Sequence, residues 1–315
     1  MRTAAMLLLT VHGVLHILAV SASAEDYEYR IDKDEEHRLY GNLNQNDIPG
    51  GGEHMCGPTA AVNSFMYLQR KYPGHFNSSL VGDADGNGTP DTYEDMKEAA
   101  ETLAGPDYMN TKTNGTWGDM FISGKSKYME SVLLGKTVYG AELIHEWALE
   151  GKRPVDERPQ IDKPDWVTDN TVPTWTFLWD RLSSCAAVEI LINWDWNEED
   201  EQYEGGHYLT IKSFFWNDVN RDNIIQREEN ATIDYIDPRT GEVKLSDIWF
   251  DPSFDTGGFH DGGLGIEYSY PDPEDPGLEI TVDGQITMAM SQTLPEPATL
   301  LLLALGGMAM MRRRP

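Results

Sequence analysis

A cysteine at the predicted start of a helix limits what this chain can fold into more than any other feature. The segment HMCGPTAAVNSF, residues 54–65, places Cys56 just before Pro58, a residue that suits the first turn of a helix. Apolar residues then follow at i, i+4 and i+7, which predicts a helix to about residue 70. The unpaired N–H groups at a helix N-terminus stabilise a thiolate and lower the pKa of a thiol. We therefore expect Cys56 to act as a nucleophile.

A thiolate nucleophile needs a base and an acceptor that orients the base, and one predicted hairpin offers both. The segment EGGHYLTIKSFFW places His207 at the start of a β-rich run, and TIDYIDPRTG gives a second strand that ends at Asp237. A strand, a turn and a strand would bring Asp237 beside His207. The candidate catalytic residues therefore occur in the order Cys, His, Asp.

Three motifs in this order, CGPTAAVN, GGHYLTI and YIDP, resemble the papain-like cysteine peptidases of the bacteriocin-processing (double-glycine leader peptidase) type. The resemblance covers roughly residues 40–245. It implies an α+β fold in which the helix bearing the nucleophile packs on an antiparallel β-sheet. It also implies Cys56 as the nucleophile, His207 as the general base and Asp237 as the orienting acid.

The same resemblance implies a glutamine a few residues before the cysteine, as a donor to the oxyanion. Gly50 stands six residues upstream here, and the nearest glutamine is Gln45, eleven residues upstream. The glycine run 50–52 is interpreted as a loop insertion that restores the geometry. Gln45 is therefore the candidate second oxyanion donor, beside the backbone N–H of Cys56.

A segment after the Cys56 helix, GDADGNGTPDTYED, has the spacing of an EF-hand calcium loop. Its oxygen ligands fall at positions 1, 3, 5, 9 and 12 of that loop, and Gly88 stands at position 6, where the chain turns sharply. The predicted ligands are the side chains of Asp83, Asp85, Asn87, Asp91 and Glu94 and the backbone carbonyl of Thr89.

A second loop with the same spacing, NDVNRDNIIQREEN, lies between His207 and Asp237. Asn223 takes the glycine position, which asparagine fills because it tolerates left-handed geometry. The predicted ligands are the side chains of Asp218, Asn220, Asp222, Gln226 and Glu229 and the backbone carbonyl of Ile224. We expect one or two structural Ca²⁺ ions in the two loops; the alternative is acidic turns without metal.

The second loop also suggests a role for calcium in catalysis. It occupies the tip of the hairpin that joins the predicted base to its orienting acid, so bound Ca²⁺ would hold the catalytic geometry. The alternative is that the loop is remote and that calcium only protects the fold against unfolding.

Residues 1–24 have the pattern of a secretory signal peptide: Arg2, an apolar run over residues 4–20 and the small residues Ala-Ser-Ala before position 25. An N-terminal membrane anchor is the alternative. We expect export across the inner membrane and cleavage by signal peptidase.

The other end, residues 291–315, carries Pro-Glu-Pro at 295–297, a short apolar segment and three arginines. This tail resembles the PEP-CTERM sorting signal of exopolysaccharide-producing Gram-negative bacteria. The resemblance implies an exosortase-type processing enzyme, transient anchoring by a short transmembrane segment, and delivery to the cell surface, outer envelope or extracellular matrix. An ordinary C-terminal anchor is the alternative.

Residues 25–290 remain for one peptidase-like domain with the calcium loops inserted. The formal net charge of −29 repels nucleic acid and suits a calcium-binding secreted protein. Within the domain, AELIHEWALEG at 141–151 predicts a helix. Cys56 and Cys185 are the two cysteines of the chain, so a disulfide between them is the alternative to a reactive thiol.

The leading expectation is a secreted, surface-sorted, calcium-binding cysteine peptidase that hydrolyses bonds in a peptide or protein substrate. One alternative is a transglutaminase-like acyl transferase, which product analysis would distinguish. The other is a non-catalytic calcium-dependent matrix protein on a peptidase-like scaffold, in which Cys56 would resist a thiol-directed affinity label.

Overall fold

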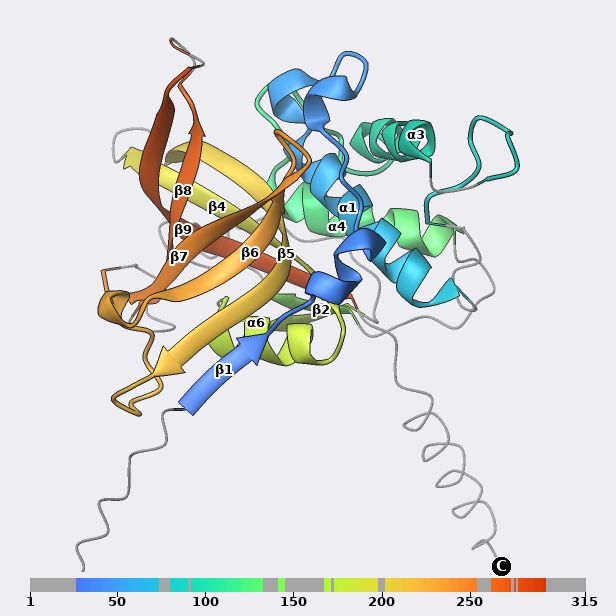
Figure 1. The fold of residues 1–315 in the computed structure, drawn as a ribbon. Coiled ribbons are helices and arrows are strands. Elements are labelled where there is room, and N and C mark those ends of the chain that lie inside the picture. The colour runs from blue at the N-terminus through green and yellow to red at the C-terminus, as the bar shows by residue number, and fades with distance from the viewer. Residues whose placement is uncertain are drawn as a thin grey trace, which may run out of the picture.

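Six antiparallel strands close into a barrel, with helices packed on one side of it (Figure 1). The computed structural model describes residues 27–73, 80–89, 92–132, 141–144, 167–170, 173–197, 202–253, 262–272, 275 and 277–292. The barrel strands are β4 (Ala187–Asn197), β5 (Gln202–Asp218), β6 (Ala231–Asp237), β7 (Glu242–Asp251), β8 (Gly263–Pro271) and β9 (Glu279–Gln292). The predicted signal peptide, residues 1–24, lies outside the described residues. So does the predicted tail, residues 291–315, except for residues 291 and 292, which end β9.

Strand β4 closes the barrel because it pairs with β5 along one edge and with β9 along the other. Register shifts between Leu191 and Ile192 in β4, and between Ile211 and Ser213 in β5, bend the strands where the sheet curves. Three short strands extend the sheet beyond the barrel: β1 (Tyr27–Ile31) pairs with β5, and β2 (Ala141–Ile144) joins β9 to β3 (Val167–Asn170).

The predicted papain-like α+β fold, with a helix on an antiparallel sheet, is therefore wrong. The chain is mostly β, with a few helices around a closed six-stranded barrel. Alternating apolar residues predict that strands exist, but the pairing of β4 with two distant segments depends on contacts that no local pattern contains. The helix predicted from residue 141 is also wrong at its start, because residues 141–144 pair with β9 and β3 as a strand.

The helical side of the molecule is built around α1 (Cys56–Lys71), of which all but two residues are buried. The other elements are α3 (Tyr93–Ala104), α4 (Gly118–Val132) and α6 (Trp175–Ser183), with the 3₁₀ turns η1 (Asp34–Leu39), η2 (Gln45–Asp47), η3 (Gly52–His54) and η5 (Arg227–Glu229). Helices α1, α3 and α4 lie together on one side of the barrel, and α1 packs on strands β4 and β5 (Figure 1). The hydroxyl of Thr210 in β5 donates to the carbonyl of Ala60 and ties α1 to the barrel wall.

Two apolar cores result from the alternation of side chains along the strands. In β4, Ile190 and Ile192 belong to the barrel interior, whereas Leu191 between them belongs to the core shared with the helices. Helix α6 adds Phe177 and Leu178 to the interior core. The strands thus separate an inner core from an outer one that the helices cover.

One ion pair lies wholly inside the outer core. Lys125 of α4 donates to Glu189 of β4, both side chains are fully buried, and the Lys125 ammonium lies 5.3 Å from the centre of the Phe65 ring. Burial lowers the pKa of Lys125, although the Glu189 carboxylate opposes this shift. The pair therefore joins helix to barrel at a position where neither charge can reach water.

Removing one partner of this pair should destabilise the fold strongly. Lys125→Met leaves the Glu189 carboxylate buried without its cation, and we expect a loss of about 3–5 kcal/mol in the free energy of unfolding, measured in urea. Lys125→Met combined with Glu189→Leu removes both charges and should recover most of that loss. A double variant as unstable as the single one would contradict this account.

Candidate active site

Cys56 lies at the start of α1, as the sequence predicts, and its side chain is 6% exposed. No side chain caps this helix, and its first turn contains no acidic residue. Burial raises the pKa of the Cys56 thiol. A hydrogen bond and the charge of His207, a backbone hydrogen bond from Tyr208 and the charge of Arg239 more than offset this effect, so the pKa is lowered.

His207 and Asp237 are neighbours on the barrel strands β5 and β6. Nε2 of His207 lies 2.9 Å from Oδ1 of Asp237, and both side chains are almost completely buried. His207 pairs with Ile192 of the interior core, and its ring lies 5.4 Å from that of Tyr268. Because Nε2 faces Asp237, Nδ1 is the ring nitrogen that remains for Cys56.

The charge of His207 follows from these two contacts. Burial lowers the pKa of the His207 imidazole, but hydrogen bonds to Asp237 and Cys56 raise it further, and the net shift is upward. A raised imidazole pKa and a lowered thiol pKa together favour a thiolate–imidazolium pair. This is the charge state that a cysteine nucleophile needs before it meets a substrate.

Asp237 is held as a carboxylate by several groups. Its Oδ1 accepts from the backbone N–H of Arg239 at 2.9 Å, and the Lys244 ammonium lies 3.1 Å from Oδ2. Burial raises the pKa of Asp237, but the bond to His207 and the charges of His207 and Lys244 lower it well below its usual range. Asp237 can therefore orient His207 without taking its proton.

Gln45, the candidate oxyanion donor, reaches this region through its backbone. Its N–H donates to the carbonyl of Pro238 at 2.7 Å, and Asn46 donates to the carbonyl of Arg239 at 3.0 Å. The Gln45 side chain is 1% exposed, and its Oε1 has no hydrogen-bond partner among the described residues. The structure thus places Gln45 beside the turn that follows Asp237, and its role as an oxyanion donor stays a prediction.

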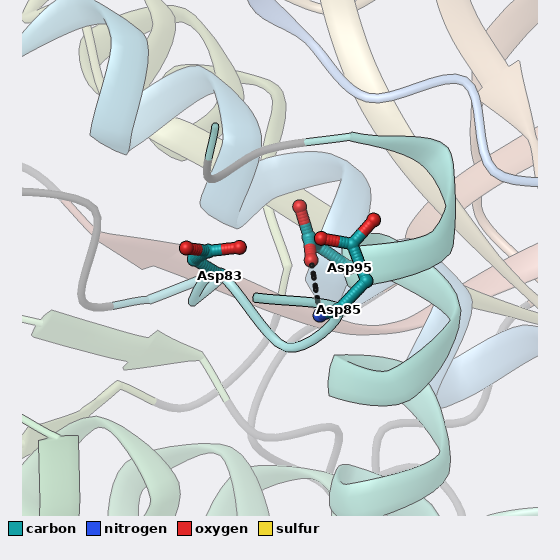
Figure 2. A group of neighbouring side chains, drawn as sticks. All are labelled: Asp83, Asp85 and Asp95. Carbon is teal, nitrogen blue, oxygen red and sulfur yellow. Dashed lines mark hydrogen bonds between the residues drawn. The ribbon is translucent and has the colours of Figure 1, made fainter. Parts of the chain in front are cut away.

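The first predicted calcium loop has the turns of an EF-hand loop, but a different residue closes it. The N–H of Gly88 donates to Asp83 at 2.9 Å, and that of Asn87 donates to Asp85 at 3.0 Å. Carboxylate oxygens of Asp83, Asp85 and Asp95 lie within 4.8 Å of one another. Figure 2 shows the three side chains grouped at the start of α3. Glu94 instead pairs with Lys97, and Asp91 lies outside the described residues.

Asp95 is the loop residue that the EF-hand spacing missed. It closes a capping box with Thr92 at the start of α3, and its Oδ1 accepts from the N–H of Ala84 at 2.8 Å. In the second loop Glu229 accepts from the N–H of Val219, which holds the same position in its loop as Ala84 holds in the first. Counted from the first residue of each loop, Asp95 is one position later than Glu229. The Thr-x-x-Asp capping signal was present in the sequence and identifies Asp95.

The second loop repeats the same hydrogen bonds at the tip of the β5–β6 hairpin. The N–H of Asn223 donates to Asp218 at 3.2 Å, that of Asp222 donates to Asn220 at 3.0 Å, and that of Ile224 donates to Asp222 at 2.8 Å. Gln226 and Glu229 form a capping box at the start of η5, and the Glu229 carboxylate also accepts a hydrogen bond from the Trp216 indole at 2.9 Å.

Two features of this second loop matter for metal binding. Asp218 is 1% exposed, and its Oδ1 has no hydrogen-bond partner among the described residues, which leaves a buried carboxylate oxygen for a cation. His207 and Asp218 lie eleven residues apart along β5, or about 35 Å at the rise of a strand. The loop is therefore at the far end of the hairpin from the His207–Asp237 contact.

Two further residues of the site were not identified from the sequence. Lys244 stands opposite Tyr235 on the next strand, diagonal to Asp237, so a cross-strand reading of the YIDPRTGEVK hairpin could have found it. Tyr208 contributes through its backbone, which side-chain patterns do not reveal. Cys56 and Cys185 are both free thiols, and the alternative of a disulfide between them has no support in the structure.

Comparison with known proteins identifies one segment. Residues 293–314 match the PEP-CTERM protein-sorting motif, as the sequence predicted for the tail. The chain therefore carries the signal of an exported, surface-sorted protein. No curated protein sequence and no solved structure matches it. Within the part of the chain that the structure describes, none of the helices has both the length and the apolar character to traverse a bilayer.

The charge state of the site predicts how the reactivity of Cys56 depends on pH. Between pH 8 and pH 6 an ordinary thiol loses alkylation rate on the order of 100-fold, because its thiolate disappears. The lowered pKa of Cys56 keeps more of its thiolate as the pH falls, so we expect a clearly smaller loss of rate than for an ordinary thiol. The measurement is the rate of iodoacetamide labelling of the Cys56 peptide by mass spectrometry.

The matched variant is His207→Ala. It leaves the burial that raises the pKa of Cys56 and removes the hydrogen bond that lowers it, so labelling should become steeply pH-dependent. An equally steep profile in the unaltered chain would exclude the thiolate–imidazolium pair.

Proposed function

We propose that this chain is an exported thiol hydrolase that cleaves peptide bonds, with Cys56 as its nucleophile. The observation that carries the proposal is the buried relay from Cys56 through His207 to Asp237, with 2.9 Å between Nε2 and Oδ1. The proposal rests on this relay and on the motifs around it, which are similar to those of bacteriocin-processing peptidases. It does not rest on the fold.

The residues divide the reaction into two steps. The Cys56 thiolate attacks the carbonyl carbon of the scissile bond, and the imidazolium of His207 gives its proton to the departing amine. Water, deprotonated by His207, then attacks the thioester, and the acid product leaves with Cys56 again a thiolate. Asp237 stabilises the positive charge of His207 and fixes its ring. The backbone N–H of Cys56 and the amide of Gln45 are the candidate donors to the oxyanion.

The sorting motif gives the setting of this activity. We infer that signal peptidase removes residues 1–24 and that an exosortase-type enzyme processes the tail that contains residues 293–314. The enzyme would then act at the cell surface, in the outer envelope or in the extracellular matrix, after transient anchoring by the C-terminal segment. Its formal charge of −29 suits these surroundings and disfavours nucleic acid as a partner.

We also propose that the two acidic loops hold structural Ca²⁺. Oxygen ligands are those that Ca²⁺ prefers. In the second loop Asp218, Asn220, Asp222, Gln226 and Glu229, with the carbonyl of Ile224, would supply them, and the unpartnered Oδ1 of Asp218 fits this assignment. In the first loop Asp83, Asp85 and Asp95 would contribute, with Asn87 and the carbonyl of Thr89. The separation of eleven residues along β5 between His207 and Asp218 favours a stabilising role over control of catalysis.

Substitutions in the relay test the hydrolase. Cys56→Ala or His207→Ala should lower peptide hydrolysis by about 10⁶-fold, and Asp237→Asn by a smaller factor on the order of 10⁴. The assay is mass spectrometry of the products of a denatured protein substrate, with circular dichroism to establish that each variant is folded.

The products also separate the alternative functions. New carboxyl and amino termini support a hydrolase, whereas an isopeptide bond to an added amine would identify an acyl transferase. If the folded chain resists a thiol-directed affinity label at Cys56, the remaining alternative is the non-catalytic matrix protein.

Removal of the second loop's carboxylates tests the role of calcium. Asp218→Ala with Asp222→Ala should abolish the stabilisation that calcium gives through this loop, which is about 2.7 kcal/mol at 100 times the dissociation constant. Unfolding is measured with calcium and with a chelator, and Asp83→Ala with Asp85→Ala tests the first loop in parallel. Well below melting, the labelling rate of Cys56 should stay unchanged. A slower rate in the folded variant would instead show that this loop governs the catalytic geometry.

A further inference from the structure

A cavity of about 310 Å³ lies on the outer wall of the barrel, where Asn193 of β4 pairs with Gln285 of β9. This volume is at the small end for ligand sites and fits one side chain or one small molecule. Its lining is strongly polar: the acids Asp195, Asp251 and Asp283, the amides Asn193 and Gln285, and one cation, Arg227.

One wall of the cavity is rigid. Trp249 lies flat over Gly265 of the next strand, where an added Cβ would come within 2.4 Å of the indole ring. On top of Trp249 lies the guanidinium of Arg227, 4.0 Å from the ring centre. Arg227 in turn makes two hydrogen bonds to Asp283, at 2.7 and 3.0 Å. Stacking and two hydrogen bonds therefore fix both the cation and its partner.

The cavity carries a net negative charge. Arg227 and Asp283 neutralise each other, which leaves Asp195 and Asp251. Within the described part of the chain, neither of these two carboxylates has a cation as a partner. Asp195 has a φ of +57°, a left-handed conformation that is uncommon for a residue other than glycine. Two uncompensated carboxylates on a chain of formal charge −29 attract a cation and repel an anion.

The cavity is connected to the Cys56 end of α1 by a continuous set of contacts. Thr116 lies against Gly57, with 3.0 Å from its Oγ1 to the position of a Cβ there, and its carbonyl accepts from the Tyr208 hydroxyl. Two residues on, a Cβ added at Gly118 would lie 3.8 Å from the side chain of Leu191, so the two residues are neighbours. Leu191 precedes the cavity residue Asn193 by two positions on the same face of β4.

The residue between Thr116 and Gly118 is also suited to a substrate path. Trp117 is 50% exposed, an unusual state for so large an apolar side chain. It lies in the chain between the residue beside Cys56 and the residue beside the cavity. A peptide that leaves the thiol in this direction would meet Trp117 before it reaches the acidic cavity.

From this arrangement we propose that the cavity is a substrate subsite that binds the lysine or arginine side chain of a peptide. The position of the subsite relative to the cleaved bond rests on the proposed hydrolase function, but its preference for a cation does not. Asp195 and Asp251 would bind the ammonium or guanidinium group, Asp251 through Oδ2 because its Oδ1 accepts from Ser253.

A binding experiment tests the cavity without relying on catalysis. N-acetylarginine amide and N-acetylcitrulline amide have nearly the same shape but differ in charge. In the full chain with Cys56→Ala, calorimetric titration should give at least about tenfold tighter binding of the arginine compound. Adding Asp195→Asn with Asp251→Asn should abolish that difference, whereas Glu101→Gln, an exposed acid on α3, should preserve it. Equal binding of the two compounds, or tight binding of glucose in place of arginine, would overturn the proposal.

A cleavage experiment then tests the subsite in the unaltered chain. Cleavage sites mapped in a denatured protein should show an excess of lysine or arginine at one fixed position near the cut, and Asp195→Asn with Asp251→Asn should reduce it about tenfold while iodoacetamide still labels Cys56 at the normal rate. Cleavage without any basic preference would refute the subsite and leave the hydrolase. Inert Cys56 with no cleavage would refute the hydrolase, and the titration would still decide whether the cavity prefers a cation.

Discussion

The double pairing of β4 is the constraint on which the rest of the structure depends. Because β4 pairs with β5 and β9, the sheet must close, and closure turns one face of every barrel strand toward a shared interior. Ile192 of β4 fixes the register of β5 at His207, and β6 then brings Asp237 to the same end of the barrel. The outer face of β4 and β5 supports α1, which positions Cys56. The candidate site is thus built where the barrel meets the helices, from three elements distant in sequence.

The local parts of this arrangement could be predicted from the sequence, whereas the pairing of distant strands could not. Pro58 and the apolar spacing after it indicated where α1 begins, and the β-rich runs at His207 and Asp237 indicated two adjacent strands. The prediction of the fold class was wrong because closure of the barrel depends on β8 and β9, which lie far from these motifs in the chain. The strand at residues 141–144 shows the same limit: its sequence favours a helix, but two neighbouring strands offer its backbone hydrogen bonds in the extended form.

The EF-hand spacing predicts the turns of the two acidic loops but not every residue that closes them. Hydrogen bonds from backbone N–H groups to Asp and Asn side chains join residues that are close in sequence, so both loops adopt the turns that the motif predicts. The closing residue is less local, because it sits on the element that follows. In the second loop η5 places Glu229 as the motif requires, but in the first loop α3 starts at its Thr92 cap and brings Asp95 inward in place of Glu94. The capping box of α3 therefore determines that Asp95 closes the first loop, which the EF-hand spacing alone does not predict.

The buried charges of the candidate site explain why its parts occur together. A thiolate at Cys56 requires a cation nearby. The imidazolium of His207 supplies this cation only if burial does not lower the pKa of His207 so far that it loses its proton. Asp237 prevents that loss, but a third buried charge would itself be costly without Lys244 and the N–H of Arg239. The charges therefore alternate in sign from the end of α1, through the barrel rim, to the partly exposed ammonium of Lys244. Lys244 lowers the pKa of Asp237, Asp237 raises the pKa of His207, and His207 lowers the pKa of the Cys56 thiol.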